Sequence, residues 1–169
     1  SRRPVFEVDS AFVSLLDADL FELRNKELTD FTATDVDRFE LEFSGTAIVC
    51  QKDTSGTWQL VEPADRTPKS WKISSIIRKA SQLTVEKFIN DNPSSSNAYG
   101  MANPAKAVFY DGDARLVSLD LAFIDGTAYV RINGDPAVYQ VESSVYETLT
   151  PALDDISDPV ETAAKADTL

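Results

Sequence analysis

The sequence predicts an α+β fold of two antiparallel β-meander units, each with a helix packed on one face, related by an internal repeat. Residues 38–43 alternate apolar and charged side chains, which is the pattern of a half-buried strand, and further strand candidates with short turns follow. Residues 73–83 place apolar side chains at helical spacing. Residues 138–149 resemble residues 5–16, so a strand that leads into a helix is expected twice.

Residues 1–35 are interpreted as the end of a preceding repeat, a strand plus a short helix, followed by a connector. At an offset of 133 residues (138 minus 5), the two copies share two valines, a serine and the closing leucine. Ser10 is the expected N-cap of the short helix, because its hydroxyl can accept a hydrogen bond from a free backbone N–H group. The strands expected before Val5 are missing, so we expect the chain to be a piece of a longer protein.

The first meander-plus-helix unit is predicted over residues 36–92. The alternating strand is followed by strands over residues 46–52 and 57–61, with glycine-containing turns between them. The helix is expected to begin at Thr67-Pro68, because proline is tolerated at the first helical position, where no backbone hydrogen bond is lost. Its apolar stripe is then expected to cover one face of the meander.

The second meander-plus-helix unit is predicted over residues 93–153. The strand candidates are residues 105–110, 116–123, 127–132 and 137–141, and the repeated strand-to-helix segment closes the unit. Asp125-Gly126 and Asn133-Gly134 are strong hairpin signals, because both residue types tolerate positive φ. Residues 154–169 lack periodicity and are rich in acidic and polar residues, so we expect a disordered tail there.

The composition excludes several classes of function. The 169 residues hold 16 Lys and Arg against 28 Asp and Glu, a net charge of −12, which repels nucleic-acid phosphates and anionic lipid headgroups. There is no histidine, so histidine-based triads, histidine-ligated metal sites and a Cys–His nucleophile are excluded. The single cysteine, Cys50, lies in an apolar run. Asp111-Gly112-Asp113 resembles the start of a calcium loop, but Ala122 replaces the closing glutamate, so we interpret it as a β-turn. We expect no catalytic residue, cofactor or metal.

Three aromatic residues, Trp71, Tyr99 and Trp58, are the candidate contacts for a partner or ligand. Trp58 is in phase with Leu60 on a predicted strand, so we expect it in the core. Trp71 lies near the start of the predicted helix and is expected to be half exposed. It is therefore the better interface candidate, because tryptophan is enriched among residues that dominate binding energy.

Several short motifs follow one another along the chain in a characteristic order. They are Asp35-Val36 before the alternating strand, residues 56–63 with Trp58 and Pro63, the Ile- and Leu-rich helix, residues 87–91, Tyr99-Gly100, Pro104, and the strands at 128–132 and 138–141. This order resembles that of domain-of-unknown-function family 4340. The resemblance covers nearly everything from about Val5 to about Leu153.

Members of that family are typically bacterial, with an N-terminal membrane helix followed by one or more extracytoplasmic units. Some are linked to ABC transporters, including those of gliding-motility type. The resemblance therefore implies a periplasmic or extracytoplasmic location, a membrane anchor in the full-length protein, and protein partners that include ABC-transporter subunits. It carries over no catalytic residues.

The leading hypothesis is a non-enzymatic extracytoplasmic interaction or scaffold module, accessory to an ABC-type transporter or an envelope assembly. One alternative is a small-ligand or carbohydrate-binding domain with an aromatic platform, which requires a concave pocket with aromatic and convergent polar groups. The other is a histidine-free hydrolase with paired carboxylates, which requires two acids facing each other in a cleft, one with a raised pKa.

Overall fold

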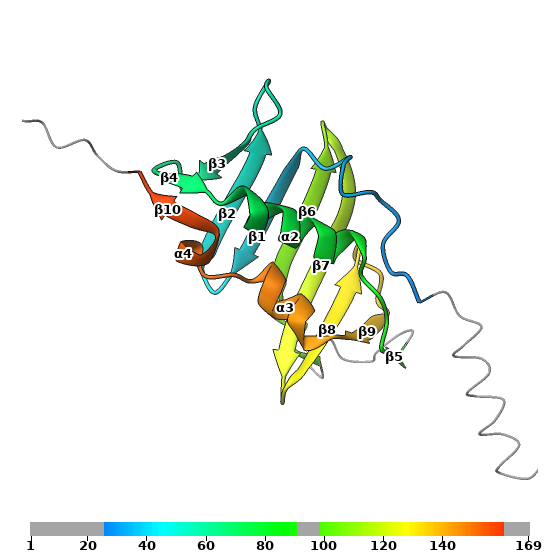
Figure 1. Cartoon of the computed structure of the whole chain (residues 1–169). Coiled ribbons are helices and arrows are strands. Elements are labelled where there is room, and N and C mark those ends of the chain that lie inside the picture. Colours follow the sequence, from blue (N-terminus) through cyan, green and yellow to red (C-terminus); the bar gives the residue numbers. More distant parts are fainter. Residues whose placement is uncertain (1–25, 91–98, 161–169) are drawn as a thin grey trace, which may run out of the picture.

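Two antiparallel meanders meet at their first strands and form one sheet in the computed structural model, which describes residues 26–90 and 99–160 (Figure 1). The eight strands lie in the order β3-β2-β1-β6-β7-β8-β9-β5. Their bounds are β1 Arg38–Phe43, β2 Thr46–Lys52, β3 Trp58–Glu62, β5 Lys87–Asn90, β6 Ala105–Asp111, β7 Ala114–Ile124, β8 Thr127–Ile132 and β9 Val138–Val141. Because β1 pairs with β6, the two meanders share one continuous apolar face.

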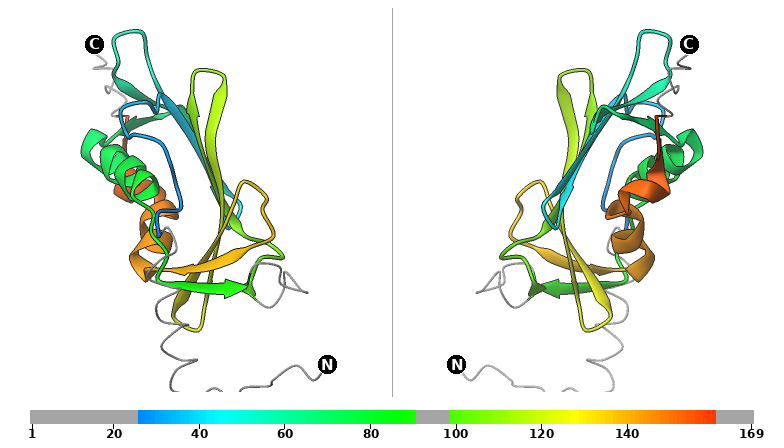
Figure 2. Two further views of the ribbon diagram at one scale, coloured as in Figure 1. Left: turned by 90° about the vertical axis from the view of Figure 1, so that its right-hand side faces the viewer. Right: turned by 90° about the vertical axis from the view of Figure 1, so that its left-hand side faces the viewer.

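The helices cover this apolar face of the sheet (Figure 2). They are α2 Ser70–Ser81, α3 Ser143–Leu149 and α4 Leu153–Ile156. Helix α2 buries one stripe of side chains at helical spacing, namely Ile73, Ile76, Ile77 and Ala80. The α+β class and the predicted packing of helices on meanders are therefore confirmed, with both meanders in a single sheet.

A row of aromatic rings crosses the junction between the meanders. Phe39 of β1 lies directly opposite Phe109 of β6, both side chains are fully buried, and their ring centroids are 5.8 Å apart. Trp58 continues the row on one side, 5.6 Å from Phe39, and Phe31 continues it on the other, 5.9 Å from Phe109. Each such pair contributes about 0.5–1.5 kcal/mol beyond the burial of apolar area, so the row binds the two meanders together.

The last strand of each half of the chain pairs with a strand of the other half: β5 completes the eight-stranded sheet, whereas β10 (Ser157–Pro159) and β4 (Arg66–Pro68) form a separate two-stranded sheet. Strand β5 follows α2 but pairs with β9, where Phe88 lies opposite Tyr139. Strand β10 follows α3 and α4 but pairs with β4, the short strand that precedes α2. The two halves are thus joined by a reciprocal exchange of strands.

This exchange overturns two predictions from the sequence. The helix begins at Ser70 rather than at Thr67-Pro68, because residues 66–68 form β4 and pair with β10. Residues 154–160 are not a disordered tail, because Ile156 is fully buried and Arg66 donates hydrogen bonds to Oγ and O of Ser157, at 2.9 and 3.0 Å. Residues 161–169 and the strand and helix predicted over residues 5–16 lie outside the described residues.

Both predicted turns form, but only one of them closes a two-residue hairpin. Asp125 and Gly126 have φ angles of 50° and 79° and join β7 directly to β8, as predicted. Asn133 and Gly134 also have positive φ angles, 52° and 76°, and the N–H of Asp135 donates to the carbonyl of Ile132 at 2.8 Å, so the predicted tight turn forms. The connection nevertheless continues to residue 137, and the Asn133 side chain accepts a hydrogen bond from the backbone N–H of Ser118 on β7, at 2.9 Å.

We predict that Ile156→Ala destabilises the protein by about 2–5 kcal/mol, because it removes a fully buried side chain that anchors α4 and β10. Asp155→Ala is the matched control. Asp155 is the exposed neighbour of Ile156, so this substitution should change the free energy of unfolding by less than about 0.5 kcal/mol. Urea unfolding followed by circular dichroism measures both. Equal midpoints for the two variants would show that α4 and β10 lie outside the cooperative fold.

Candidate functional site

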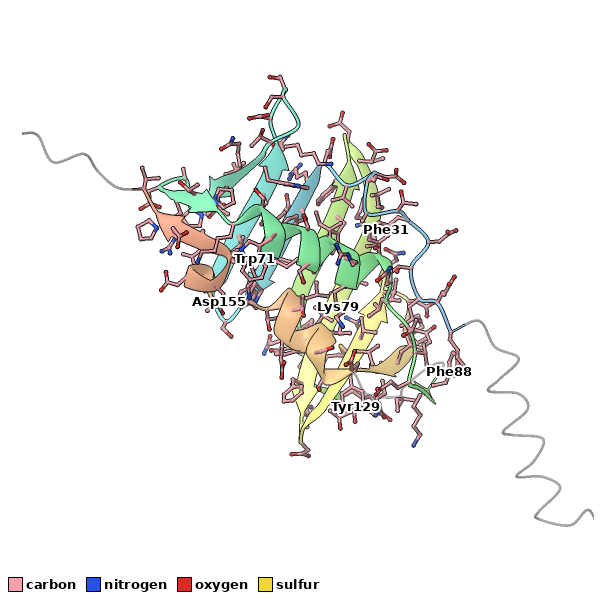
Figure 3. All side chains as sticks on the ribbon, viewed as in Figure 1. Phe31, Trp71, Lys79, Phe88, Tyr129 and Asp155 are labelled. Carbon is pink, nitrogen blue, oxygen red and sulfur yellow. The ribbon has the colours of Figure 1, made fainter. Side chains whose placement is uncertain are left out.

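The outer face of α2 carries an exposed ridge. Since the apolar stripe of the helix faces the core, the residues on the opposite side face solvent. These are Trp71, Ser75, Arg78 and Gln82, all exposed and spaced i, i+4, i+7 and i+11 along the helix; we call them the Trp71 ridge. Trp71 is 67% exposed, more than the half expected from the sequence (Figure 3).

An ammonium group stands over one face of this exposed indole. Lys72 Nζ lies 4.8 Å from the centroid of the Trp71 ring, within the range in which a cation is attracted to an aromatic face. The contact restricts the rotamers of both side chains. Part of the conformational entropy that Trp71 would lose on binding is therefore already lost in the free protein.

Basic residues dominate α2, although the chain as a whole is strongly acidic. The helix and its N-cap residue contain Lys69, Lys72, Arg78 and Lys79 and no acidic residue. Lys69 forms an ion pair with Asp158 of β10 at 3.0 Å, and Lys79 forms one with Glu142, just before α3, at 3.3 Å. Ion pairs with neighbouring elements thus neutralise the two flanks of the helix.

A groove opens beside the ridge, between α2, α3 and α4. Its volume is about 250 Å³, and the buried side chains Ile76 and Ile156 contribute to its floor. Lys72, Glu147 and Asp155 line its rim, so cationic and anionic groups alternate around an apolar base. A groove of this kind can take one apolar side chain of a partner that lies along α2.

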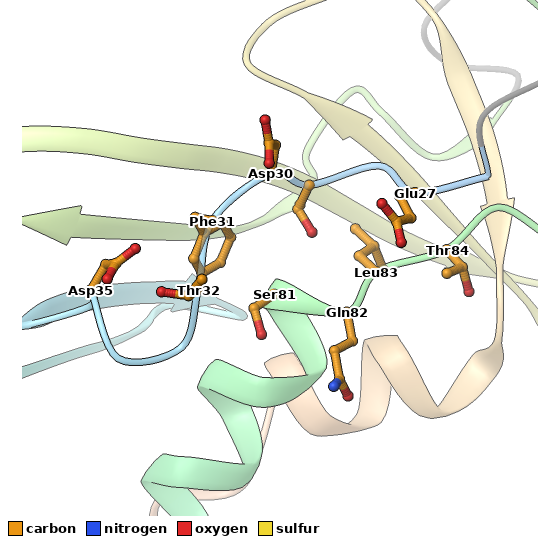
Figure 4. Close-up of a pocket in the computed structure, with 10 residues that line it drawn as sticks. Glu27, Asp30, Phe31, Thr32, Asp35, Ser81, Gln82, Leu83 and Thr84 are labelled. Atoms are coloured by element: carbon orange, nitrogen blue, oxygen red, sulfur yellow. The ribbon is translucent and has the colours of Figure 1, made fainter.

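A second hollow lies at the other end of α2 (Figure 4). It has a volume of about 450 Å³ and is bounded by residues 27–35 and residues 81–84. Glu27, Asp30 and Asp35 contribute carboxylates, and Phe31 contributes an aromatic ring that also stacks on Phe109 of the core. No lysine or arginine lines it, so the chemistry of this hollow favours a neutral polar or a cationic group.

The three predicted aromatic residues do not form one platform. Trp71 lies on the outside of the helix layer, whereas Trp58 is half buried between the layers, 5.6 Å from Phe39. Tyr99 packs against Tyr129, with ring centroids 5.4 Å apart, on the opposite face of the sheet. The binding platform between the two units that the ligand-binding alternative requires is therefore not assembled from these residues.

Gly100 allows the Tyr99 segment to lie close on that face. Its φ is +73°, and a Cβ atom built on it would come within 2.9 Å of the Ala122 side chain. A larger residue would lift the segment off β7. This glycine therefore has a packing role.

The sheet face opposite the helices is charged and carries two ion pairs. Arg38 pairs with Glu40, and Arg131 pairs with Asp120 at 2.6 Å. Tyr110 donates a hydrogen bond to Glu40 at 3.2 Å, and burial together with the Glu40 charge raises the pKa of its hydroxyl. Glu42, Glu62 and Lys106 line a hollow on the same face and form no ion pair within the described residues, so this face is only partly neutralised. It is a poorer docking surface than the Trp71 ridge because it lacks an exposed tryptophan.

The titratable groups lend little support to acid–base or nucleophilic chemistry. Hydrogen bonds from Ser55, Thr57 and Gln59 lower the pKa of Asp53 to about 2, and hydrogen bonds from Ser144 and Lys79 lower the pKa of Glu142, whereas a general acid needs a raised pKa. Burial raises the pKa of the Cys50 thiol to about 12, which suppresses the nucleophilic thiolate. Within residues 26–90 and 99–160, no group of three or more Asp, Glu or Cys residues could hold a metal ion.

Sequence reasoning identified Trp71 but missed the rest of the ridge. Ser75 and Arg78 are ordinary surface residues when considered singly. Their spacing of four and seven residues from Trp71 was the available signal, because it places all three on one line of the helix. The ion pairs that neutralise the helix flanks join residues far apart in the sequence and gave no such signal.

Comparison with known proteins identifies one family model. The model described as "Domain of unknown function (DUF4340)" matches residues 1–104 and again residues 58–168, so the two matches overlap. Searches of curated proteins and of solved structures found no match.

We predict that Cys50, the only cysteine in the chain, reacts with Ellman's reagent at least about 100-fold more slowly in the folded protein than in urea. The side chain is fully buried and its pKa is about 12, so at about pH 8 almost none of it is thiolate. Absorbance of the released thiolate measures the rate. If the folded protein reacts as fast as the unfolded protein, the Cys50 thiol is not buried and protonated as described, and a reactive thiol is supported.

Proposed function

The chain belongs to the family described as domain of unknown function (DUF4340), and we propose that it is a non-enzymatic interaction module that binds a protein through the Trp71 ridge. The observation that carries the proposal is the exposure of Trp71, at 67%, on a helix whose opposite face is fully packed. Tryptophan and arginine are the residue types that most often dominate interface energies, and the ridge presents both within two helical turns.

The Trp71 ridge is favoured over the other surfaces that could accept a protein. The uncovered sheet face satisfies four of its charges internally, in the pairs Arg38–Glu40 and Arg131–Asp120. The edge strands β3 and β5 span five and four residues, and the pairing of each with its neighbour contains a register shift. Short, irregular edges offer few backbone hydrogen bonds to an added strand.

The proposal extends to the cellular setting. The family resemblance supports an extracytoplasmic module, tethered to a bacterial membrane in the full-length protein and accessory to an ABC-type transporter or an envelope assembly. Among the described residues, no helix is long and apolar enough to cross a membrane.

We further propose that the two halves of the sheet are copies of one repeated unit. In each half a meander leads to a short fourth strand (β4 or β9), a helix (α2 or α3) and a final strand (β5 or β10). Each final strand pairs with the fourth strand of the other half. The overlapping double match of the family model supports this equivalence.

The hollow at the C-terminal end of α2 favours a second candidate function, the binding of a small polar ligand. Besides the three carboxylates, the lining of this hollow contains the hydroxyl-bearing residues Thr29, Thr32, Ser81 and Thr84. Phe31 is its only aromatic residue and already stacks on Phe109. A sugar platform therefore has weaker support here than a general polar site.

We predict that a photoreactive amino acid at Ser75, in the centre of the ridge, forms adducts with a membrane-associated protein in cells that express the full-length protein. Adding Trp71→Ala should reduce the yield by about tenfold or more, because it removes the expected anchor. The matched control places the same photoreactive residue at Gln51, which is equally exposed but lies on the uncovered sheet face.

Immunoblotting and mass spectrometry of the adducts measure the outcome. Adducts at position 75 that depend on Trp71 support the interaction module. Equal adducts at positions 75 and 51, or none at position 75, would contradict it.

A further inference from the structure

We infer that the Trp71 ridge binds an acidic, amphipathic helical segment of the partner, laid along α2. This inference rests on the proposed function and adds the chemistry of the partner. It follows from three features of the described residues. These are the shape of the ridge, the two cations beside it that form no ion pair, and the carboxylates that border it.

The shape of the ridge fits a helix. The positions i, i+4, i+7 and i+11 form the type of row into which the side chains of a second helix pack. The row runs along α2, whose 12 residues span about 18 Å. Only Trp71, at one end, is bulky and apolar, while the groove with Ile76 and Ile156 lies beside it. A partner helix therefore needs an apolar stripe at that end.

Two serines beside the ridge, Ser74 and Ser81, can be covered without loss of hydrogen bonds. Ser74 Oγ donates to the carbonyl of Ser70 at 2.9 Å, and Ser81 Oγ donates to the carbonyl of Arg78 at 3.2 Å. Because these hydroxyl protons are already bonded within the helix, burying them leaves no unsatisfied donor. Serines also allow a close approach of a second backbone on this side of the helix.

The charges beside the ridge select an acidic partner. Lys69 and Lys79 are paired with carboxylates of neighbouring elements. Lys72 and Arg78, in contrast, form no ion pair with any carboxylate in residues 26–90 and 99–160. In a chain of net charge −12, these two cations stand on the ridge or directly next to it. Carboxylates of a partner would complete charge-assisted hydrogen bonds with them.

The carboxylates around the ridge confine the surface that can accept an anionic partner to a narrow strip along α2. A strip of this width favours a helix over a lipid bilayer as the partner. Glu142 and Glu147 lie along α3, and Asp154, Asp155 and Asp158 lie along α4 and β10. A flat anionic bilayer that touched Trp71 would also meet these charges, whereas a helix about 10 Å wide can lie along α2 alone. Glu27, Asp30 and Asp35 border the far end near Gln82, so the acidic residues of the partner contact Lys72 and Arg78 and not that end.

The test uses three synthetic helical peptides of about 14 residues, long enough to cover α2 at 1.5 Å per residue. All carry the same leucine stripe, and they differ only in having Glu, Gln or Lys at the positions that flank it. Fluorescence of Trp71 reports binding in a Trp58→Phe background, whose fold is checked by circular dichroism. We expect the Glu peptide to shift the emission to the blue and to bind at least about tenfold more tightly than the Gln peptide.

Variants and vesicles complete the test. Arg78→Glu should weaken binding of the Glu peptide by about tenfold or more, whereas Lys87→Glu, the same charge change at an exposed position on β5, should leave it within about twofold. Equal binding of the three peptides would overturn the inference. So would a Trp71 shift with phosphatidylglycerol vesicles that the Glu peptide does not produce.

The inference and the proposed function can fail separately. If the segment that crosslinks to position 75 in cells is neutral or basic, the interaction module stands and the acidic-helix inference is wrong. If position 75 forms no adducts, the proposed function itself is contradicted.

Discussion

The structure depends on the reciprocal pairing of β5 with β9 and of β10 with β4. Helix α2 lies between β4 and β5, and both of these strands are paired with elements of the other half of the chain. The helix is therefore held at both ends and lies diagonally across the sheet (Figures 1 and 2). Its apolar stripe then faces the core and its opposite side must face solvent. The exposure of the Trp71 ridge is thus a consequence of how the two halves are joined.

The pairing of β1 with β6 gives the chain one continuous core. The aromatic row from Trp58 through Phe39 and Phe109 to Phe31 crosses from the first meander to the second. Its central pair, Phe39 and Phe109, takes one ring from each meander, so neither meander alone could form it. A rigid base of this kind limits the movement of α2, which lowers the entropy cost when a partner binds to its outer face.

Much of the fold could be predicted, because its signals are local. The alternation around Phe39 predicted a strand with one buried face, and the helical spacing of Ile73, Ile76 and Ile77 predicted α2. The pairing of β4 with β10 could not be predicted, because both strands are three residues long, contain proline and lie about 90 residues apart. Ile156, one apolar residue in an acidic stretch, gave no periodic signal although it anchors that pairing. Likewise, the sequence pointed to Trp71 as an interface residue, but the charges around it depend on non-local ion pairs.

The most direct test of this account is to produce residues 1–92 and 93–169 as separate fragments and to measure circular dichroism and hydrogen exchange alone and after mixing. We expect each fragment to be largely unfolded alone, because its last strand has no partner and the contacts of Phe109 with Phe39 and Phe31 are lost. Mixing should restore the sheet, with protection of the amides of β5 and β10. Cooperative folding of either fragment by itself would contradict the claim that reciprocal strand pairing holds the structure together.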